Sequence, residues 1–145
     1  MLRLAAWRPS SGAWPYLLFL GALVVRLVYL LQGHQAPAQD TPDYDDIALN
    51  LLRGEGFVAR SNWFGFEVRS WRPPFYPFFL ALVYGTLGYS HLPVLVLQAA
   101  VGAGTAALVF GLTRILFPAA APIAGVLAAL YGPLVSSAAE VMSET

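Results

Sequence analysis

Long apolar runs separated by one polar stretch dominate the pattern of this sequence. Residues 14–31 form the first run, and as a helix of about 18 residues they would span about 27 Å, close to the thickness of a bilayer's hydrocarbon core. Residues 92–116 and 121–142 form two more runs long enough to cross, with Pro118 and Pro122 marking a tight turn between them. We therefore predict an all-α integral membrane protein with about three transmembrane helices.

A further apolar segment, residues 74–88, is too short for a span. Gly85, Gly88 and Pro93 predict a break between it and the next run. A helix of about 14 residues does not cross the hydrocarbon core, so we predict a short helix lying at the membrane interface.

The polar stretch 32–73 holds six of the eight acidic residues and four of the eight arginines. Arg3 and Arg8 precede the first span, and the positive-inside rule then places the N-terminus in the cytoplasm and this stretch outside. A secretory signal peptide is the alternative for the first run. The length of that run, the charge of Arg26 within it, and the lack of a clear small-residue cleavage site favour a retained helix.

Within the outer loop, the sequence predicts one amphipathic helix. Thr41 can cap its start and Pro42 suits its first position. Gly54 is a plausible end for it. Apolar residues recur at helical spacing, which gives one buried stripe: Tyr44, Ile47, Ala48, Leu51 and Leu52. Acidic residues near its start suit the positive end of the helix dipole: Asp43, Asp45 and Asp46.

Composition supports the membrane interpretation and excludes several classes of function. The chain is 58% hydrophobic and 11% charged, with mean hydropathy +0.63, whereas soluble domains carry about 25% charged residues. Its net charge is zero and it has no basic block, so nothing indicates nucleic-acid binding. It has no cysteine, and His34 and His91 lie far apart, which argues against disulfides and against a thiolate or histidine metal site.

Three charged residues fall at the same outer face if residues 74–88 do not cross. Asp40 precedes the helix cap and has no helix-forming task. Arg72 stands beside a rigid Pro-Pro turn, where it can bind a phosphate in a bidentate manner or simply reach the lipid headgroups. Glu144 ends the last run. Arg26 lies deeper in the first run and is expected to be a buried partner of an acid or a carbonyl.

Two motifs in this order resemble one known family. The first is Asp40-Thr41-Pro42-Asp43-Tyr44 with Ala48 and then Leu51-Leu52-Arg53-Gly54-Glu55-Gly56-Phe57, and the second is Arg72-Pro73-Pro74-Phe75-Tyr76-Pro77-Phe78-Phe79-Leu80-Ala81. Leu97-Gln98, Tyr131-Gly132-Pro133 and Ser143-Glu144-Thr145 continue the pattern. The set resembles the GT-C membrane glycosyltransferases that use polyprenyl-phosphate sugars, related to protein O-mannosyltransferases and the lipid A aminoarabinose transferase.

This resemblance implies an activity and roles for four residues. Asp40 matches the acid proposed as general base on the acceptor, and Arg72 matches the basic position near the donor's phosphate. Glu144 matches a second acidic position near the site, and Tyr44 falls within the substrate-binding motif. The implied partners are a polyprenyl-phosphate sugar donor and the membrane lipid. The acids at the site could hold a divalent cation, but no metal-ligand spacing accompanies them, so the sequence predicts no metal site and no certain cofactor.

Family members run to several hundred residues, whereas this chain ends at Thr145. We therefore expect the N-terminal portion of a multi-pass transferase of the cell (inner or plasma) membrane, inactive as an isolated fragment. The alternative is a non-catalytic membrane scaffold, an assembly module or a degenerate remnant of such an enzyme. A transporter fragment is disfavoured, because the polar residues gather at one face instead of along the middle of the spans.

Overall fold

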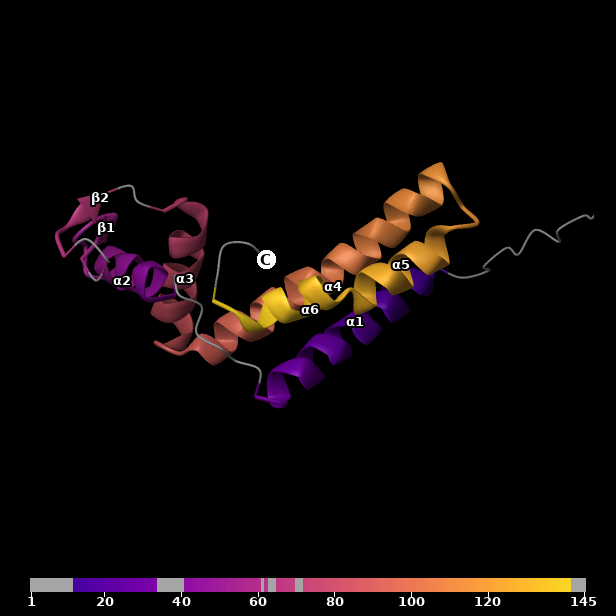
Figure 1. Cartoon of the computed structure of the whole chain (residues 1–145), viewed down its shortest axis with the longest axis horizontal. Coiled ribbons are helices and arrows are strands. Elements are labelled where there is room, and N and C mark those ends of the chain that lie inside the picture. The colour runs from indigo at the N-terminus through magenta and orange to yellow at the C-terminus, as the bar shows by residue number, and fades with distance from the viewer. Residues whose placement is uncertain (1–11, 34–40, 61, 63–64, 70–71, 142–145) are drawn as a thin grey trace, which may run out of the picture.

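The computed structural model describes residues 12–33, 41–60, 62, 65–69 and 72–141. Helices make up most of this part of the chain, and its small sheet has two strands (Figure 1). The elements are α1 (Trp14–Leu31), α2 (Thr41–Leu52), β1 (Val58–Ala59), β2 (Val68–Arg69), α3 (Phe75–Leu87), α4 (His91–Leu116), α5 (Ala121–Leu130), α6 (Gly132–Ser136) and a 3-10 turn η1 (Ser137–Ala139). The predicted all-α class is confirmed.

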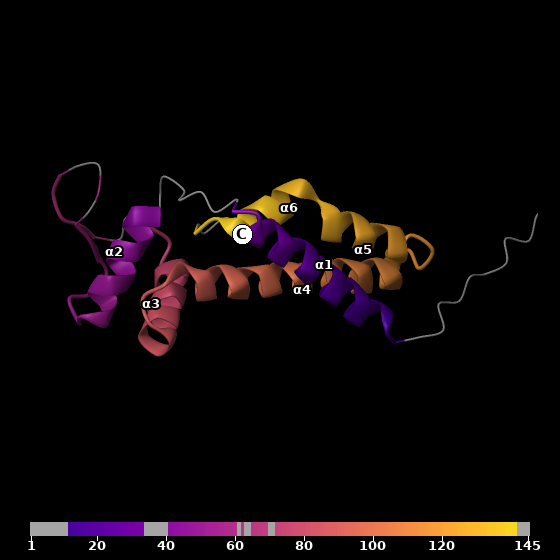
Figure 2. The ribbon, with the colours of Figure 1, turned by 90° about the horizontal axis from the view of Figure 1, so that it is seen from below.

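Helices α1, α4 and the α5–α6 pair lie side by side as an elongated bundle (Figures 1 and 2). Helices α1 and α4 are each long and apolar enough to cross a membrane, and α5 with α6 and η1 meets the same test as one bent unit. The chain alternates in direction through these three elements. The end of α1, the start of α4 and the end of η1 therefore fall toward one end of the bundle, which we call the loop end (Figure 1).

Small residues let the bundle helices approach closely. Ala22 of α1, Ala103 and Ala106 of α4, and Ala129 of α5 form one buried cluster. Close backbone approach of this kind is the usual basis of helix association in lipid, where apolar side chains gain little by leaving the solvent. The large apolar side chains that remain exposed on α1 and α4 suit contact with lipid.

The helix predicted over about residues 121–142 is broken in two in the structure, although its two pieces together are long and apolar enough for one span. Helix α5 ends at Leu130, and the segment Gly132–Ala139 continues at a bend of 53°. The cause is Pro133, which has no backbone N–H to donate and whose ring crowds the preceding turn. A kink of this size at a proline is the expected outcome of that lost hydrogen bond.

A second layer, made of α2, the β1–β2 hairpin and α3, covers the loop end of the bundle (Figure 1). Helix α3 is steeply inclined to α4 in both views (Figures 1 and 2) and is shorter than the helices that could cross a membrane. Gly88, at φ 85°, ends α3 in a conformation that favours glycine. The antiparallel hairpin pairs Val58 with Arg69, and the sequence pattern did not reveal it because its strands are only two residues long.

Candidate functional site

The site begins at Arg72, just ahead of α3. Its Nη2 donates to Asp43 Oδ2 at 2.9 Å, and the Asp43 side chain is 3% exposed while that of Arg72 is 19% exposed. The guanidinium carbon also lies 5.3 Å from the centre of the Tyr44 ring. A charge-assisted hydrogen bond and a cation–π contact thus fix the guanidinium at the loop end.

A chain of contacts leads from Arg72 into the bundle. Tyr44 packs edge-on against Tyr76, with ring centroids 5.2 Å apart. The Tyr76 hydroxyl donates to Gln98 Oε1 at 3.0 Å, and Gln98 Nε2 donates to the backbone carbonyl of Glu140, also at 3.0 Å. Burial raises the pKa of Tyr76 well above its usual range, with the Asp45 carboxylate adding to the effect, so this hydroxyl stays protonated as a donor.

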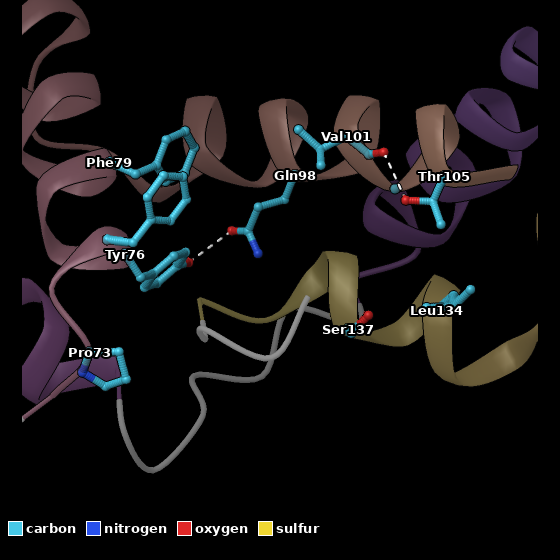
Figure 3. Close-up of a pocket in the computed structure, with 10 residues that line it drawn as sticks. Pro73, Tyr76, Phe79, Gln98, Val101, Thr105, Leu134 and Ser137 are labelled. Carbon is cyan, nitrogen blue, oxygen red and sulfur yellow. Dashed lines mark hydrogen bonds between the residues drawn. The ribbon is translucent and has the colours of Figure 1, made fainter. Parts of the chain in front are cut away.

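A pocket of about 380 Å³ lies between α3, α4 and the α6–η1 segment (Figure 3). Pro73 and the aromatic side chains of α3 form one wall, and Leu134 of α6 contributes to the opposite one. Its polar groups are few: the Tyr76 hydroxyl on α3, the side chains of Gln98 and Thr105 on α4, and that of Ser137 on η1 (Figure 3). Such a lining suits an apolar ligand held in register by one or two hydrogen bonds.

Arg72 does not itself line this pocket but lies next to residues that do. The next residue, Pro73, lines it, and so does Tyr76, which packs against the Tyr44 ring beneath the guanidinium. The arrangement places a fixed cation beside an apolar cavity. This combination matches a ligand with an anionic head and a hydrocarbon tail.

A second polar cluster surrounds Asp45 on the other side of α2. Its carboxylate accepts hydrogen bonds from the Tyr84 hydroxyl at 2.6 Å and the Tyr89 hydroxyl at 3.2 Å, and His91 Nε2 lies 2.7 Å away. Burial raises the pKa of Tyr84 far above its usual range, and its hydrogen bond to Asp45 acts in the same direction. The cluster binds α2 to the corner between α3 and α4.

The acids of α2 were interpreted from sequence as helix-start residues, yet each has a partner outside its own helix. Asp43 binds Arg72, Asp45 binds the tyrosine–histidine cluster, and Asp46 accepts from the backbone N–H of Arg60. The sequence contained a sign that Asp43 and Asp45 make contacts outside the helix. Asp43 lies four residues before the apolar Ile47 and Asp45 lies three before Ala48, so both acids flank the buried stripe of the helix.

The structure brings together only part of the predicted site. Arg72 and Tyr44 are in contact, but Tyr44 is buried beneath the guanidinium. Asp40 and Glu144 lie outside the described residues. Among the residues that are described, no group of histidine, aspartate or glutamate side chains is arranged to hold a metal ion.

Comparison with protein-family models, with curated proteins and with solved structures finds no match to this chain.

Proposed function

We propose that this chain is part of a membrane glycosyltransferase that moves a sugar from a polyprenyl-phosphate donor to an acceptor at the outer membrane face. The observation that carries the proposal is the fixed guanidinium of Arg72, which is joined through Pro73 and the Tyr44–Tyr76 ring contact to the lining of an apolar pocket. In this proposal the guanidinium binds the phosphate of the donor, and the pocket between α3, α4 and α6–η1 takes the first part of the prenyl chain.

The proposed reaction assigns one step to Asp40 and one to Arg72. The acceptor hydroxyl oxygen attacks the anomeric carbon of the sugar, and the bond from that carbon to the phosphate oxygen breaks. The hydroxyl proton passes to the carboxylate of Asp40 as general base. The electron pair stays on the departing polyprenyl phosphate, whose negative charge Arg72 stabilises.

Phosphate binding is tested by comparing Arg72→Gln with Arg69→Gln. Both variants remove one guanidinium from the second layer or its edge. Arg69, however, lies on β2 with its side chain 75% exposed and pairs with Glu67. In the protein reconstituted into nanodiscs, we expect Arg72→Gln to lower the affinity for polyprenyl phosphate about tenfold or more, because a charge-assisted hydrogen bond is lost. Arg69→Gln should leave the affinity unchanged.

A further variant separates binding from stability. Arg72→Gln alone leaves the buried Asp43 carboxylate without this partner, which by itself destabilises the fold. The double variant Arg72→Gln/Asp43→Asn replaces the ion pair with a neutral pair and should regain stability while remaining weak in binding. If the double variant binds polyprenyl phosphate as tightly as the parent protein, Arg72 does not contact the phosphate.

Catalysis is tested at Asp40. In membranes containing the protein with whatever further chain its gene encodes, Asp40→Asn should abolish transfer from a labelled polyprenyl-phosphate sugar at unchanged protein level. Near-normal transfer by this variant would remove Asp40 from the mechanism. Binding of the donor without any transfer by the parent protein would instead favour a non-catalytic membrane module.

A further inference from the structure

Arg26 lies in α1 with its side chain fully buried in the bundle. Its Nη1 donates to two backbone carbonyls, that of Ala22 in its own helix at 3.1 Å and that of Ala129 in α5 at 3.2 Å. Within the described part of the chain, its Nε and Nη2 have no hydrogen-bond partner. A charged group held inside a spanning bundle is costly, so its presence calls for a specific role.

The carbonyl of Ala129 is the one that Pro133 leaves without a partner. In a continuous helix, the carbonyl of residue 129 accepts from the backbone N–H of residue 133. That residue is proline, which has no N–H, and the helix breaks between Leu130 and Gly132. Arg26 supplies from α1 the hydrogen bond that the proline cannot give, and its positive charge faces the negative end of α5.

Helix α4 makes room for this contact at Gly102. A Cβ atom added there would lie 2.9 Å from Arg26 Nε and 3.6 Å from its Cδ, which is too close without movement of the arginine. Gly102 also lines the pocket. Arg26 therefore lies directly behind one wall of the pocket and, through Ala129, is bonded to the helix that leads into the opposite wall.

The bend at Tyr131 decides where that opposite wall stands. Leu134 and Ser137 line the pocket, and both belong to the segment that follows the bend (Figure 3). A segment of eight residues is about 12 Å long, so straightening a bend of 53° would move its far end by roughly 10 Å.

We propose that Arg26 is a positioning residue: by replacing the hydrogen bond that Pro133 removes, it stabilises the broken third span and so sets the shape of the pocket. The part of this inference that concerns the pocket's occupant, a prenyl chain, rests on the proposed function. The part that concerns the bend does not.

A double-mutant cycle tests the replacement of one hydrogen bond by the other. Arg26→Met should raise the unfolding equilibrium constant in mixed detergent micelles about tenfold, because the buried Ala129 carbonyl loses its partner. Pro133→Ala restores an N–H at residue 133, so in the Pro133→Ala protein Arg26→Met should raise the unfolding equilibrium constant only about twofold or less. Arg114→Met, which removes an exposed arginine near the end of α4, is the matched control and should change stability little. Additive effects of the two substitutions would overturn the proposal.

The bend is measured in the same variants by spin-label distances. The chain has no cysteine, so single cysteines at Leu108 on α4 and Ser136 on α6 give a clean pair. We expect Arg26→Met/Pro133→Ala to straighten the span and to move the Ser136 label by roughly 5 Å, about half the movement of the segment's end. An unchanged distance in this stable variant would show that these residues do not set the bend. If Arg26→Met alone fails to fold, Arg26→Lys, which keeps a donor, should retain the parent distance.

Pocket occupancy is followed with a prenyl alcohol that carries a photoreactive diazirine. In the parent protein it should label pocket-lining residues such as Val101 and Leu134, and in the straightened double variant that labelling should fall at least fivefold. If the probe does not label the parent pocket, the prenyl-chain part of the proposed function fails, whereas the spin-label distances still decide the role of Arg26. If labelling persists in a variant whose distance has changed, Arg26 does not control the pocket.

Discussion

Gly102 and Gly104 both lie on α4, but alanine should lower the stability of the protein at Gly102 and raise it at Gly104. A Cβ at Gly104 meets no other atom within 4 Å, whereas a Cβ at Gly102 would lie 2.9 Å from Arg26 Nε. Both substitutions remove a glycine from α4, which by helix propensity stabilises the fold by about 1 kcal/mol. Only the contact with the buried arginine differs between them.

The size of the destabilisation by Gly102→Ala follows from the hydrogen bonds that Arg26 would lose. The arginine is fully buried, and its Nη1 is held by two carbonyls, so moving Nε away from a new methyl group breaks at least one charge-assisted bond. Such a bond is worth about 2 kcal/mol, which exceeds the propensity gain of about 1 kcal/mol. We expect Gly102→Ala to destabilise the protein by about 1 kcal/mol and to differ from Gly104→Ala by about 2 kcal/mol.

The comparison is made by reversible unfolding in mixed detergent micelles, followed by circular dichroism of the helices. The parent protein and both variants are measured in one lipid–detergent mixture. A difference between their unfolding midpoints then reflects the stability of the fold and not the composition of the mixture. If Gly102→Ala proves as stable as Gly104→Ala, the guanidinium is not confined against α4 and the account of its packing is wrong.

Two more predictions follow from the same structure. Burial raises the pKa of Tyr84 above 10.0 in the fold, so its contribution to stability is complete below pH 10 and is lost as the pH rises beyond that value. Tyr84→Phe should therefore flatten the loss of stability that unfolding measurements show between pH 8 and 11. If stability falls with pH as steeply in this variant as in the parent protein, the Tyr84 hydroxyl is not buried as described. Gly125→Ala should destabilise the bundle by about 1–3 kcal/mol, because its Cβ would lie 2.6 Å from Leu18 Cδ1 and 3.0 Å from Phe110 Cβ. A thermal unfolding midpoint at or above that of the parent protein would contradict this packing.

Hydrophobic pattern and local capping predicted most of the fold. The three apolar runs, the short helix before α4 and the helix that begins at Thr41 all have local causes: apolar length, proline position and the spacing of the buried stripe. The break at Pro133 was also visible in the sequence as Tyr131-Gly132-Pro133, but an apolar run of spanning length outweighed it. Proline is tolerated in such runs when a neighbouring helix satisfies the freed carbonyl, so the break depends on tertiary structure.

The candidate site was less predictable because its contacts join distant residues. Arg72 and Asp43 are 29 positions apart, and Asp45 and His91 are 46 apart. No local periodicity connects such pairs, and the order of motifs alone could suggest that Arg72 belongs to a site. Gln98 shows the same limit, since only the packing of α3 across α4 brings Tyr76 to its side chain.

Helix α2 holds both ends of α3. On one side Asp43 binds Arg72, which lies just ahead of α3. On the other side Asp45 binds Tyr84 in the last turn of α3 and His91 at the start of α4. Helices α2 and α3 therefore form one unit within the second layer, since α3 cannot change its angle unless α2 moves with it or one of these contacts opens. His91 begins the helix that also carries Gln98, so the same contacts join α2 to the helix that forms one wall of the pocket.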